Sequence, residues 1–303
     1  MTLNETDNTL ERRETFSLEQ SQVMSPSVMF WRQFRRHKAA LVAILVLTIM
    51  AFMCFFAPVI APYEFDAIDL RNTKQPPTLK HLMGTDELGR DLFTRVLYGG
   101  RISLTIGIFA ALVGTLFGTL IGAMAGFYGK QIDNILMRFT DIAFSIPTLP
   151  LLIVVSSFTK ASLPVIVLVI GLLSWMATAR VVRGTILSIK EQEYIIAARM
   201  IGVRNGRIIF RHILPNTFSA IVVGATLSVG GAIITESVLS FLGLGVQPPV
   251  PSWGNMLQDS QTTMASKPWL TIFPGLAILI TVLCINFIGD GLQDAIDPTL
   301  RGK

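Results

Sequence analysis

The stretch ISLTIGIFAALVGTLFGTLIGAMAGF, residues 102–127, decides the fold. It contains no Asp, Glu, Lys or Arg. As a helix it is long enough to cross the roughly 30 Å hydrocarbon layer of a membrane, which takes about 20 apolar residues. A helix can do so because its backbone polar groups bond to one another inside the segment. The stretch therefore predicts a membrane-spanning helix.

Five further apolar runs predict five further spans. The six spans are residues 39–61, 102–127, 135–158, 163–179, 217–239 and 270–288. The composition agrees, since 51% of the residues are hydrophobic and only 15% are charged, against about 25% charged residues in a soluble domain. We therefore expect an all-α membrane protein with six transmembrane helices.

The remaining composition argues against several chemistries. The two cysteines lie in apolar runs, and the three histidines have no cysteine or paired carboxylate at ligand spacing, so neither a disulfide framework nor a metal site is expected. A phosphate-binding loop needs Gly-x-x-x-x-Gly-Lys followed by Ser or Thr, and neither Gly-Lys pair of the chain fits. We expect no cofactor on this chain, no ATPase activity of its own and no nucleic-acid partner.

Orientation follows from the loops, because Lys and Arg resist translocation across a membrane. Six of them precede the first span, and seven lie in residues 180–211. An even number of spans separates the two segments, so both are predicted to be cytoplasmic. The predicted order is a cytoplasmic N-terminal segment (1–38), the first span, an external loop (62–101), a five-helix core (102–291) and a cytoplasmic tail (292–303). The six basic residues of the external loop do not fit the rule.

The span at 102–127 also carries a periodic set of glycines. They recur every four residues and share one helical face: Gly114, Gly118, Gly122 and Gly126. Small residues allow close approach of helix backbones, which is how helices associate in lipid. We expect this face to pack against another helix, and a pore-lining face is the alternative.

The loop of residues 181–215 is far longer than a connection between two helices requires. Residues 191–201 are good helix formers that place Tyr194, Ala197, Ala198 and Ile201 on one face. Gly202 stands where this helix would end, and Pro215 could begin the next span. A short helix, a turn and a second short helix are predicted, with a small apolar face for a partner. The alternative is a helix lying on lipid through its arginines.

The same loop resembles the EAA loop of ABC importer permeases. Ala197-Ala198, Gly202 and residues 212–215 (His-Ile-Leu-Pro) carry the resemblance, while Ile196 stands where the family usually has Glu. The resemblance implies a coupling helix that enters a cleft of an ATPase subunit. The residues it assigns to this role are Tyr194, Ala197, Ala198, Ile201, Gly202, Leu214 and Pro215.

Four further tracts resemble the C-type permeases of the dipeptide, oligopeptide and nickel importers. They are residues 84–91 (GTDELGRD), 100–104 (GRISL), 240–254 (SFLGLG with the following Pro-Pro and Ser-Trp-Gly) and 289–298. The resemblance implies the type I importer permease fold in the cytoplasmic (inner) membrane of a bacterium or archaeon. It also implies a homologous second permease subunit, two ATPase subunits that bind ATP and Mg, and an external substrate-binding protein. Peptides, glutathione and nickel complexes all remain open as cargo.

Ionisable residues inside spans are costly and are therefore candidate functional residues. Asp141 follows Arg138 by one helical turn, so we expect the two to pair. Glu236 is expected near the external interface, either in interfacial water or on the translocation path. No motif of an intramembrane enzyme is present. A secondary transporter driven by an ion gradient is the less favoured alternative, because the charges cluster near the span ends.

Overall fold

The computed structural model describes residues 26–158 and 162–296, and helices form nearly all of its regular structure. Within this part of the chain the β pairing is confined to one isolated bridge between Thr85 and Asp91. The predicted all-α class is confirmed. The predicted N-terminal segment is described only from residue 26, and the predicted C-terminal tail only as far as residue 296.

The first span follows a short helix. Helix α2 (Pro26–Arg36) is separated from α3 (Lys38–Phe55) by His37, whose Nδ1 accepts a hydrogen bond from the Ala40 N–H and caps α3. A short helix, α4 (Ala57–Ile60), completes the span. The break at Phe56 is explained by Pro58, which lacks a backbone N–H and crowds the carbonyl four residues earlier.

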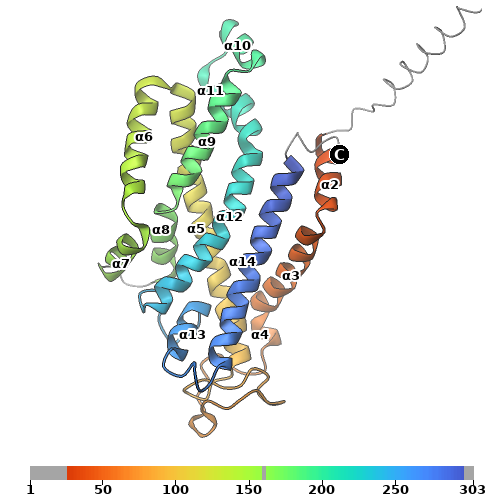
Figure 1. Ribbon diagram of the computed structural model, residues 1–303, viewed down its shortest axis with the longest axis vertical. Helices are drawn as coiled ribbons and strands as arrows, with labels where there is room; N and C mark the ends of the chain where they lie inside the picture. The colour runs from red at the N-terminus through yellow and green to blue at the C-terminus, as the bar shows by residue number, and fades with distance from the viewer. Residues whose placement is uncertain (1–25, 159–161, 297–303) are drawn as a thin grey trace, which may run out of the picture.

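Helix α5 (Leu92–Tyr128) runs through the middle of the bundle (Figure 1) and contacts α3, α8, α9 and α12. It begins earlier than the predicted span at residue 102, because Asp91 caps it by accepting a hydrogen bond from the Thr94 N–H at 2.8 Å. The end of the predicted external loop is therefore helical. The rest of that segment is irregular apart from the short 3-10 turn η1 (Leu70–Asn72).

The third and fourth predicted spans are bent. Residues 135–158 form α6 (Lys130–Ser145) and α7 (Thr148–Phe158), at 83° to one another. Pro147 explains the break, since it forces the preceding residue, Ile146, into an extended conformation. The fourth span consists of α8 (Leu163–Leu172) and α9 (Trp175–Lys190), bent by 44°, and α9 continues well beyond the predicted end at residue 179.

Helix α10 (Glu193–Met200) is the predicted short helix, but the predicted second short helix is not separate. Helix α11 (Asn205–Ile208), a π-helical turn η2 (Ile209–Ile213) and α12 (Leu214–Phe241) form one continuous span-length unit. Pro215 cannot donate a hydrogen bond to residue 211, and the wider turn before it accommodates this loss. Pro215 therefore lies inside a long helix and does not begin it.

The last two helices are α13 (Trp253–Ser260) and α14 (Trp269–Ile296). The Trp253 side chain is fully buried, and its Nε1–H donates to the Val96 carbonyl at 3.0 Å, which joins α13 to α5. Helix α14 packs on α3 and α12 and extends into the predicted tail, since residues 292–296 are helical.

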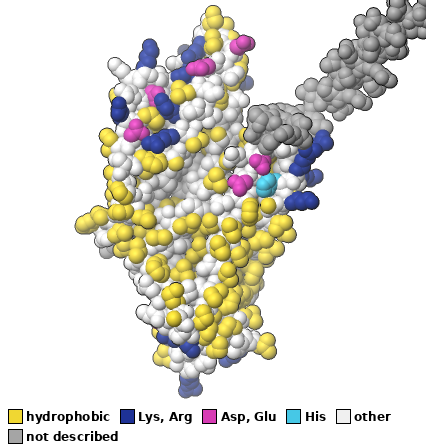
Figure 2. All heavy atoms as spheres, viewed as in Figure 1, with side chains coloured by type: hydrophobic (Ala, Val, Ile, Leu, Met, Phe, Trp, Pro, Cys, Tyr) yellow, Lys and Arg dark blue, Asp and Glu magenta, His cyan; other side chains and the backbone are white. Residues whose placement is uncertain are grey.

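Four units of the described residues are long and apolar enough to span a membrane, and the count reaches six if each bent pair is one span. Hydrophobic side chains cover a broad area over the middle of the visible face, and charged side chains gather beyond it (Figure 2). We call the two ends of the bundle the α10 end and the α13 end, after the short helix at each (Figure 1).

Candidate functional site

Helix α10 ends in a glycine cap. Gly202 has a φ of +78°, its N–H donates to the Arg199 carbonyl at 3.0 Å, and the Val203 N–H donates to the Ala198 carbonyl at 3.1 Å. These two bonds form the Schellman arrangement, which requires a left-handed residue at this position. The cap reverses the chain sharply between α10 and α11.

One side chain of α10 is fully buried, and the sequence analysis did not select it. Ile195 packs in a core with Ile186 of α9 and with Ile208 and Ile213 of the following turns. The adjacent Arg199 guanidinium lies over the Phe127 ring of α5, 5.3 Å from its centroid. These contacts attach α10 to the ends of α5 and α9. Ile195 and Ile196 are adjacent isoleucines, so helical periodicity alone did not decide which one faces inward.

The predicted face of α10 points away from this core. Tyr194, Ala197 and Ile201 are exposed, and Ala198 is half-buried. Tyr194 is held by the Asn216 Nδ2, which donates to its hydroxyl oxygen at 3.3 Å. The resemblance also assigned Leu214 and Pro215 to the coupling role, and of these Leu214 is half-buried and Pro215 is exposed.

Exposed apolar side chains gather at the tip of α10. Met200 and Ile201 are 83% and 82% exposed, and Ile196 is exposed beside them. We call Ile196, Met200 and Ile201, with Tyr194, the α10 patch. Exposed apolar side chains that cluster on a rigid helix are typical of an interaction surface. Ile196 belongs to the patch, so an apolar side chain stands where the EAA loop usually has a carboxylate.

The four predicted glycines lie against α8 and α9. A Cβ atom on Gly118 would stand 2.5 Å from the Trp175 carbonyl oxygen, and one on Gly126 would stand 3.0 Å from the Arg183 carbonyl oxygen. Gly114 and Gly122 lie equally close to Ser174 and Ala179. This face of α5 is therefore buried within the chain and does not line an opening.

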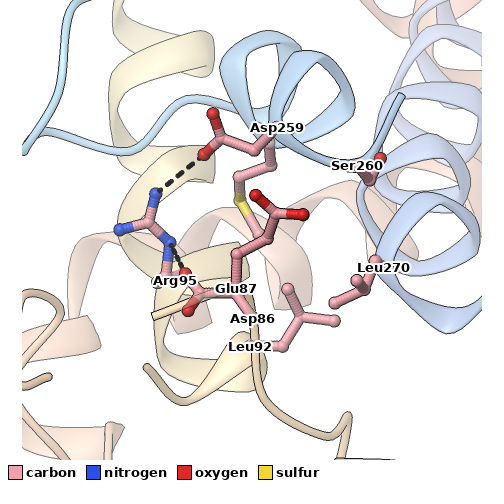
Figure 3. A pocket seen from close by; sticks show the side chains of 8 residues that line it. Asp86, Glu87, Leu92, Arg95, Asp259, Ser260 and Leu270 are labelled. Atoms are coloured by element: carbon pink, nitrogen blue, oxygen red, sulfur yellow. Dashed lines mark ion pairs between the residues drawn. The ribbon is translucent and has the colours of Figure 1, made fainter. Parts of the chain in front are cut away.

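At the α13 end, charged side chains from distant segments meet (Figure 3). The Arg90 Nε donates to Asp86 Oδ2 at 2.7 Å, and the Arg95 Nε lies 3.4 Å from the same oxygen. Both guanidinium groups also reach Asp259 of α13, at 3.9 and 3.8 Å. Burial raises the pKa of the Asp259 carboxyl group, although Arg95 and Arg90 oppose the shift. We call these four residues the outer network.

The outer network contains two of the six basic residues that the orientation rule did not fit. Arg90 and Arg95 are almost completely buried, and they are neutralised by carboxylates within the fold. Lys74 pairs with Glu87 at 2.9 Å. Sequence reasoning could balance the charges of the predicted external loop, but it could not show that Asp259 completes the set.

Glu236 is buried inside the bundle, close to the start of α13. Its side chain is fully buried, and it accepts hydrogen bonds from the Ser103 hydroxyl of α5 at 3.0 Å and from the Ser240 hydroxyl at 2.7 Å. The Ser103 oxygen also accepts a bond from the N–H of Trp253. The expectation of interfacial water at Glu236 is wrong, because three helices enclose it.

The expected pair between Arg138 and Asp141 is also wrong. The Arg180 NH2 of α9 donates to Asp141 Oδ1 at 2.7 Å, and Arg183 makes a second, bidentate pair with Asp133. Both bonds connect α6 to α9, so these carboxylates stabilise a contact between two helices and not a turn of one helix.

The fold and these sites together define a polytopic membrane subunit with a rigid α5–α9–α12 centre and an apolar patch presented on a short helix at one end. The chain belongs to the family described as the inner membrane component of binding-protein-dependent transport systems, whose model matches residues 118–302. Residues 25–77 match the N-terminal TM domain of oligopeptide transport permease C. The resemblance of the sequence to this family is thereby confirmed.

Three similar proteins cover nearly the whole chain. The dipeptide transport system permease protein DppC of Alkalihalophilus pseudofirmus is 40% identical over 93% of this chain and 93% of its own length. The oligopeptide transport system permease protein OppC of Bacillus subtilis is 38% identical over 92% and 93%. The glutathione transport system permease protein GsiD of Escherichia coli is 43% identical over 93% of both chains.

A solved structure supports the fold. A chain of the MetNI methionine ABC transporter in an inward-facing conformation is similar with a TM-score of 0.56. The match covers 68% of this chain and 98% of that chain, at 19% sequence identity. The expected fold of a type I ABC importer permease is therefore confirmed.

Proposed function

We propose that this chain forms half of the pore of an ATP-driven importer and that its cargo is a peptide delivered by an external binding protein. A homologous second permease subunit would supply the other half. The names of the relatives support this class, since they are permeases for dipeptides, oligopeptides and glutathione. Glutathione is itself a small peptide, so one scaffold would serve all three cargoes. Nickel complexes are the alternative cargo.

In this proposal the α10 end is cytoplasmic and the α13 end is external. The α10 end and the nearby α2 carry exposed basic side chains, as cytoplasmic segments do. At the α13 end, Arg90 and Arg95 are instead neutralised by the outer network. The chain is thereby assigned to the cytoplasmic membrane with both termini inside the cell.

The exposure of the α10 patch is the observation that supports a coupling role for α10. Its side chains are exposed and apolar, while Ile195 and the glycine cap fix the helix beneath them. A rigid apolar knob can enter a groove and transmit movement to the helices on which it is mounted. We infer that α10 docks into one of two cytoplasmic ATPase subunits, which bind ATP and Mg and hydrolyse the nucleotide. This chain contributes no catalytic residue to that reaction.

The test places a charge in the patch. Ile201→Glu should insert and fold normally, because the side chain is 82% exposed. Burying its unpaired carboxylate in a partner groove would cost about 3 kcal/mol, or about a hundredfold in affinity. We therefore expect the ATPase subunits to be lost when the complex is purified from detergent. Ile201 is a better position for this test than Ala198. Ala198 is half-buried, so a glutamate there would also disturb folding.

Leu79→Glu is the matched control. Leu79 is fully exposed and lies in the irregular segment before α5. The same substitution there should leave the ATPase subunits bound and transport unchanged. Full ATPase binding and full uptake by Ile201→Glu would show that α10 is not the coupling element.

A further inference from the structure

The N-terminal helix α2 is attached to the bundle by one face. Phe34 is almost completely buried against Ala295 of α14, with Phe30 and Leu292 packed around it. Gly291 of α14 permits the close approach, because a Cβ atom there would stand 3.3 Å from the Phe34 Cε2. The orientation of α2 about its axis is therefore fixed, and so is the set of side chains that remain exposed beside the packed face.

Beside this packed face, α2 presents an aromatic ring and basic groups: the Trp31 ring stacks on the Phe34 ring, with 6.0 Å between the ring centroids. Trp31 is 50% exposed, and the Arg35 guanidinium lies over its ring, 5.2 Å from the centroid. Lys38, at the start of α3, is also exposed. Trp31, Arg35 and Lys38 follow one another at spacings of four and three residues. The stacking holds the Arg35 charge beside the ring.

This basic group borders an apolar surface that is exposed on this chain. The exposed side of α3 continues with Val42, Leu45, Ile49 and Phe52, each at least half exposed. In Figure 2 the dark blue side chains over α2 and the start of α3 stand at the edge of the broad hydrophobic area. Since a helix rises 1.5 Å per residue, Arg35 and Lys38 lie within about 10 Å of Val42, at the depth of lipid head groups.

Within the described residues, one acidic group near this face has a different partner. Asp294 of α14 approaches the His37 Nε2 at 3.8 Å, and the ion pairs of the structure do not include Arg35 or Lys38. Two cationic groups beside an interfacial tryptophan thus face the layer in which phosphate groups of lipids lie.

We propose that Trp31, Arg35 and Lys38 form a binding site for the head group of an acidic phospholipid. The phosphate would accept hydrogen bonds from the guanidinium and ammonium groups, and the acyl chains would lie along the exposed side of α3. The proposal rests on the proposed function only in placing α3 across the membrane. It concerns lipid binding and is independent of ATPase docking at α10.

The test uses the full-length chain in nanodiscs of phosphatidylcholine with and without phosphatidylglycerol. Native mass spectrometry measures how much phosphatidylglycerol stays bound, and thermal unfolding measures the stabilisation that it gives. A basic side chain near an acidic membrane surface contributes about fivefold in affinity, so Arg35→Gln/Lys38→Gln should bind phosphatidylglycerol about 25-fold more weakly. Trp31→Leu keeps both charges and should cause a smaller loss. Inorganic phosphate alone should not stabilise the wild-type chain.

Arg71→Gln/Lys80→Gln is the charge-matched control. Both residues are exposed near Asp69, before α5, and removing them should leave phosphatidylglycerol binding unchanged. An equal loss in this control would show a general charge effect and overturn the proposal. So would full lipid retention by the Arg35→Gln/Lys38→Gln variant. If the same variant retains the lipid but loses the ATPase subunits when the assembled complex is purified, the face belongs to a protein partner instead.

Discussion

A carboxyl group enclosed by apolar helices needs hydrogen bonds from its surroundings, and Glu236 obtains them from hydroxyl groups of Ser103 and Ser240. Glu236→Leu would leave these hydroxyls without their acceptor. We expect a loss of about 3 kcal/mol in the free energy of unfolding. Glu236→Gln keeps an acceptor oxygen and should lose less, about 1 kcal/mol.

Thermal unfolding of both variants in detergent measures the difference. The decisive result is whether Glu236→Leu unfolds at a lower temperature than Glu236→Gln. If Glu236 lined an aqueous path, neither substitution would lower the stability of the chain by much. If Glu236→Leu unfolds at the wild-type temperature, the hydrogen bonds around Glu236 do not stabilise the junction of α5, α12 and α13.

Asp259 gives the outer network a pH dependence. Because burial raises the pKa of its carboxyl group, the folded chain binds this proton at higher pH than the unfolded chain does. Its contribution to stability is therefore most favourable below the unfolded value of about 4 and falls as the pH rises through the raised folded pKa. Asp259→Asn should remove this dependence and keep the neutral-pH stability close to that of the wild type.

The measurement is the unfolding temperature of both chains between about pH 4 and pH 8 in the same detergent. The wild-type curve should decline toward neutral pH more than the Asp259→Asn curve. Parallel curves would show that Asp259 does not contribute to the pH dependence of folding.

The contacts of single residues were harder to predict from the sequence than the helices or the fold. Spacing suggested that Asp141 pairs with Arg138, yet its partner Arg180 comes from another helix. Periodicity alone did not separate the buried Ile195 from the exposed Ile196. In both cases the deciding contact is between elements, and a one-dimensional pattern contains no information on which elements will be neighbours.

Among the helices, the contact between α5 and α9 depends on the absence of side chains. A methyl group on Gly118 would meet the Trp175 carbonyl oxygen at 2.5 Å, and a backbone atom cannot move aside easily. Gly118→Ala should therefore destabilise the chain by about 1–3 kcal/mol. A methyl group on Gly184 of α9 would have no packed neighbour within 4 Å among the described residues, so Gly184→Ala should be neutral or stabilise by about 0.5–1 kcal/mol.

Unfolding temperatures of the two variants test this pair. The substitutions are chemically identical and both lie in helices, so helix propensity is controlled. Equal stability of Gly118→Ala and Gly184→Ala would show that α5 and α9 do not need their close approach.

Elements were predicted better than their shapes. A count of apolar residues locates a span because burial in lipid depends on composition over about 20 residues. The same count does not register the 83° bend between α6 and α7, although Pro147 was visible in the sequence. It also could not show that η2 would join α11 to α12, since Pro215 is compatible with both a helix start and a wider turn.

For the whole molecule, the proposed orientation places Lys74 outside the cell and Arg204 inside it. A cysteine at position 204 should react with a membrane-impermeant thiol reagent only after the membrane is opened, and one at position 74 should react in intact cells. Both positions lie in described, non-helical segments. Cys54 and Cys284 are buried and should give little background. Labelling of positions 74 and 204 from the same side would contradict the orientation.

The order of spans, the helical class and the family could all be predicted at this largest scale, because each depends on composition or on tracts that are contiguous in the sequence. The outer network could not be predicted from the sequence. Its members come from residues 86–95 and from α13. Only the folded bundle brings Asp259 to Arg90 and to Arg95, and Figure 3 shows the pair with Arg95.

That separation along the chain sets an order of assembly during synthesis. Ribosomes release the N-terminal part of a chain first. Asp86 and Arg90 are four residues apart, so they can pair as soon as their segment emerges, whereas Asp259 is translated only after the helices from α5 to α12 have been made. Arg95 must therefore wait for its second partner until α13 arrives. The outer network closes late, and its closure marks a nascent chain in which α13 has reached its place.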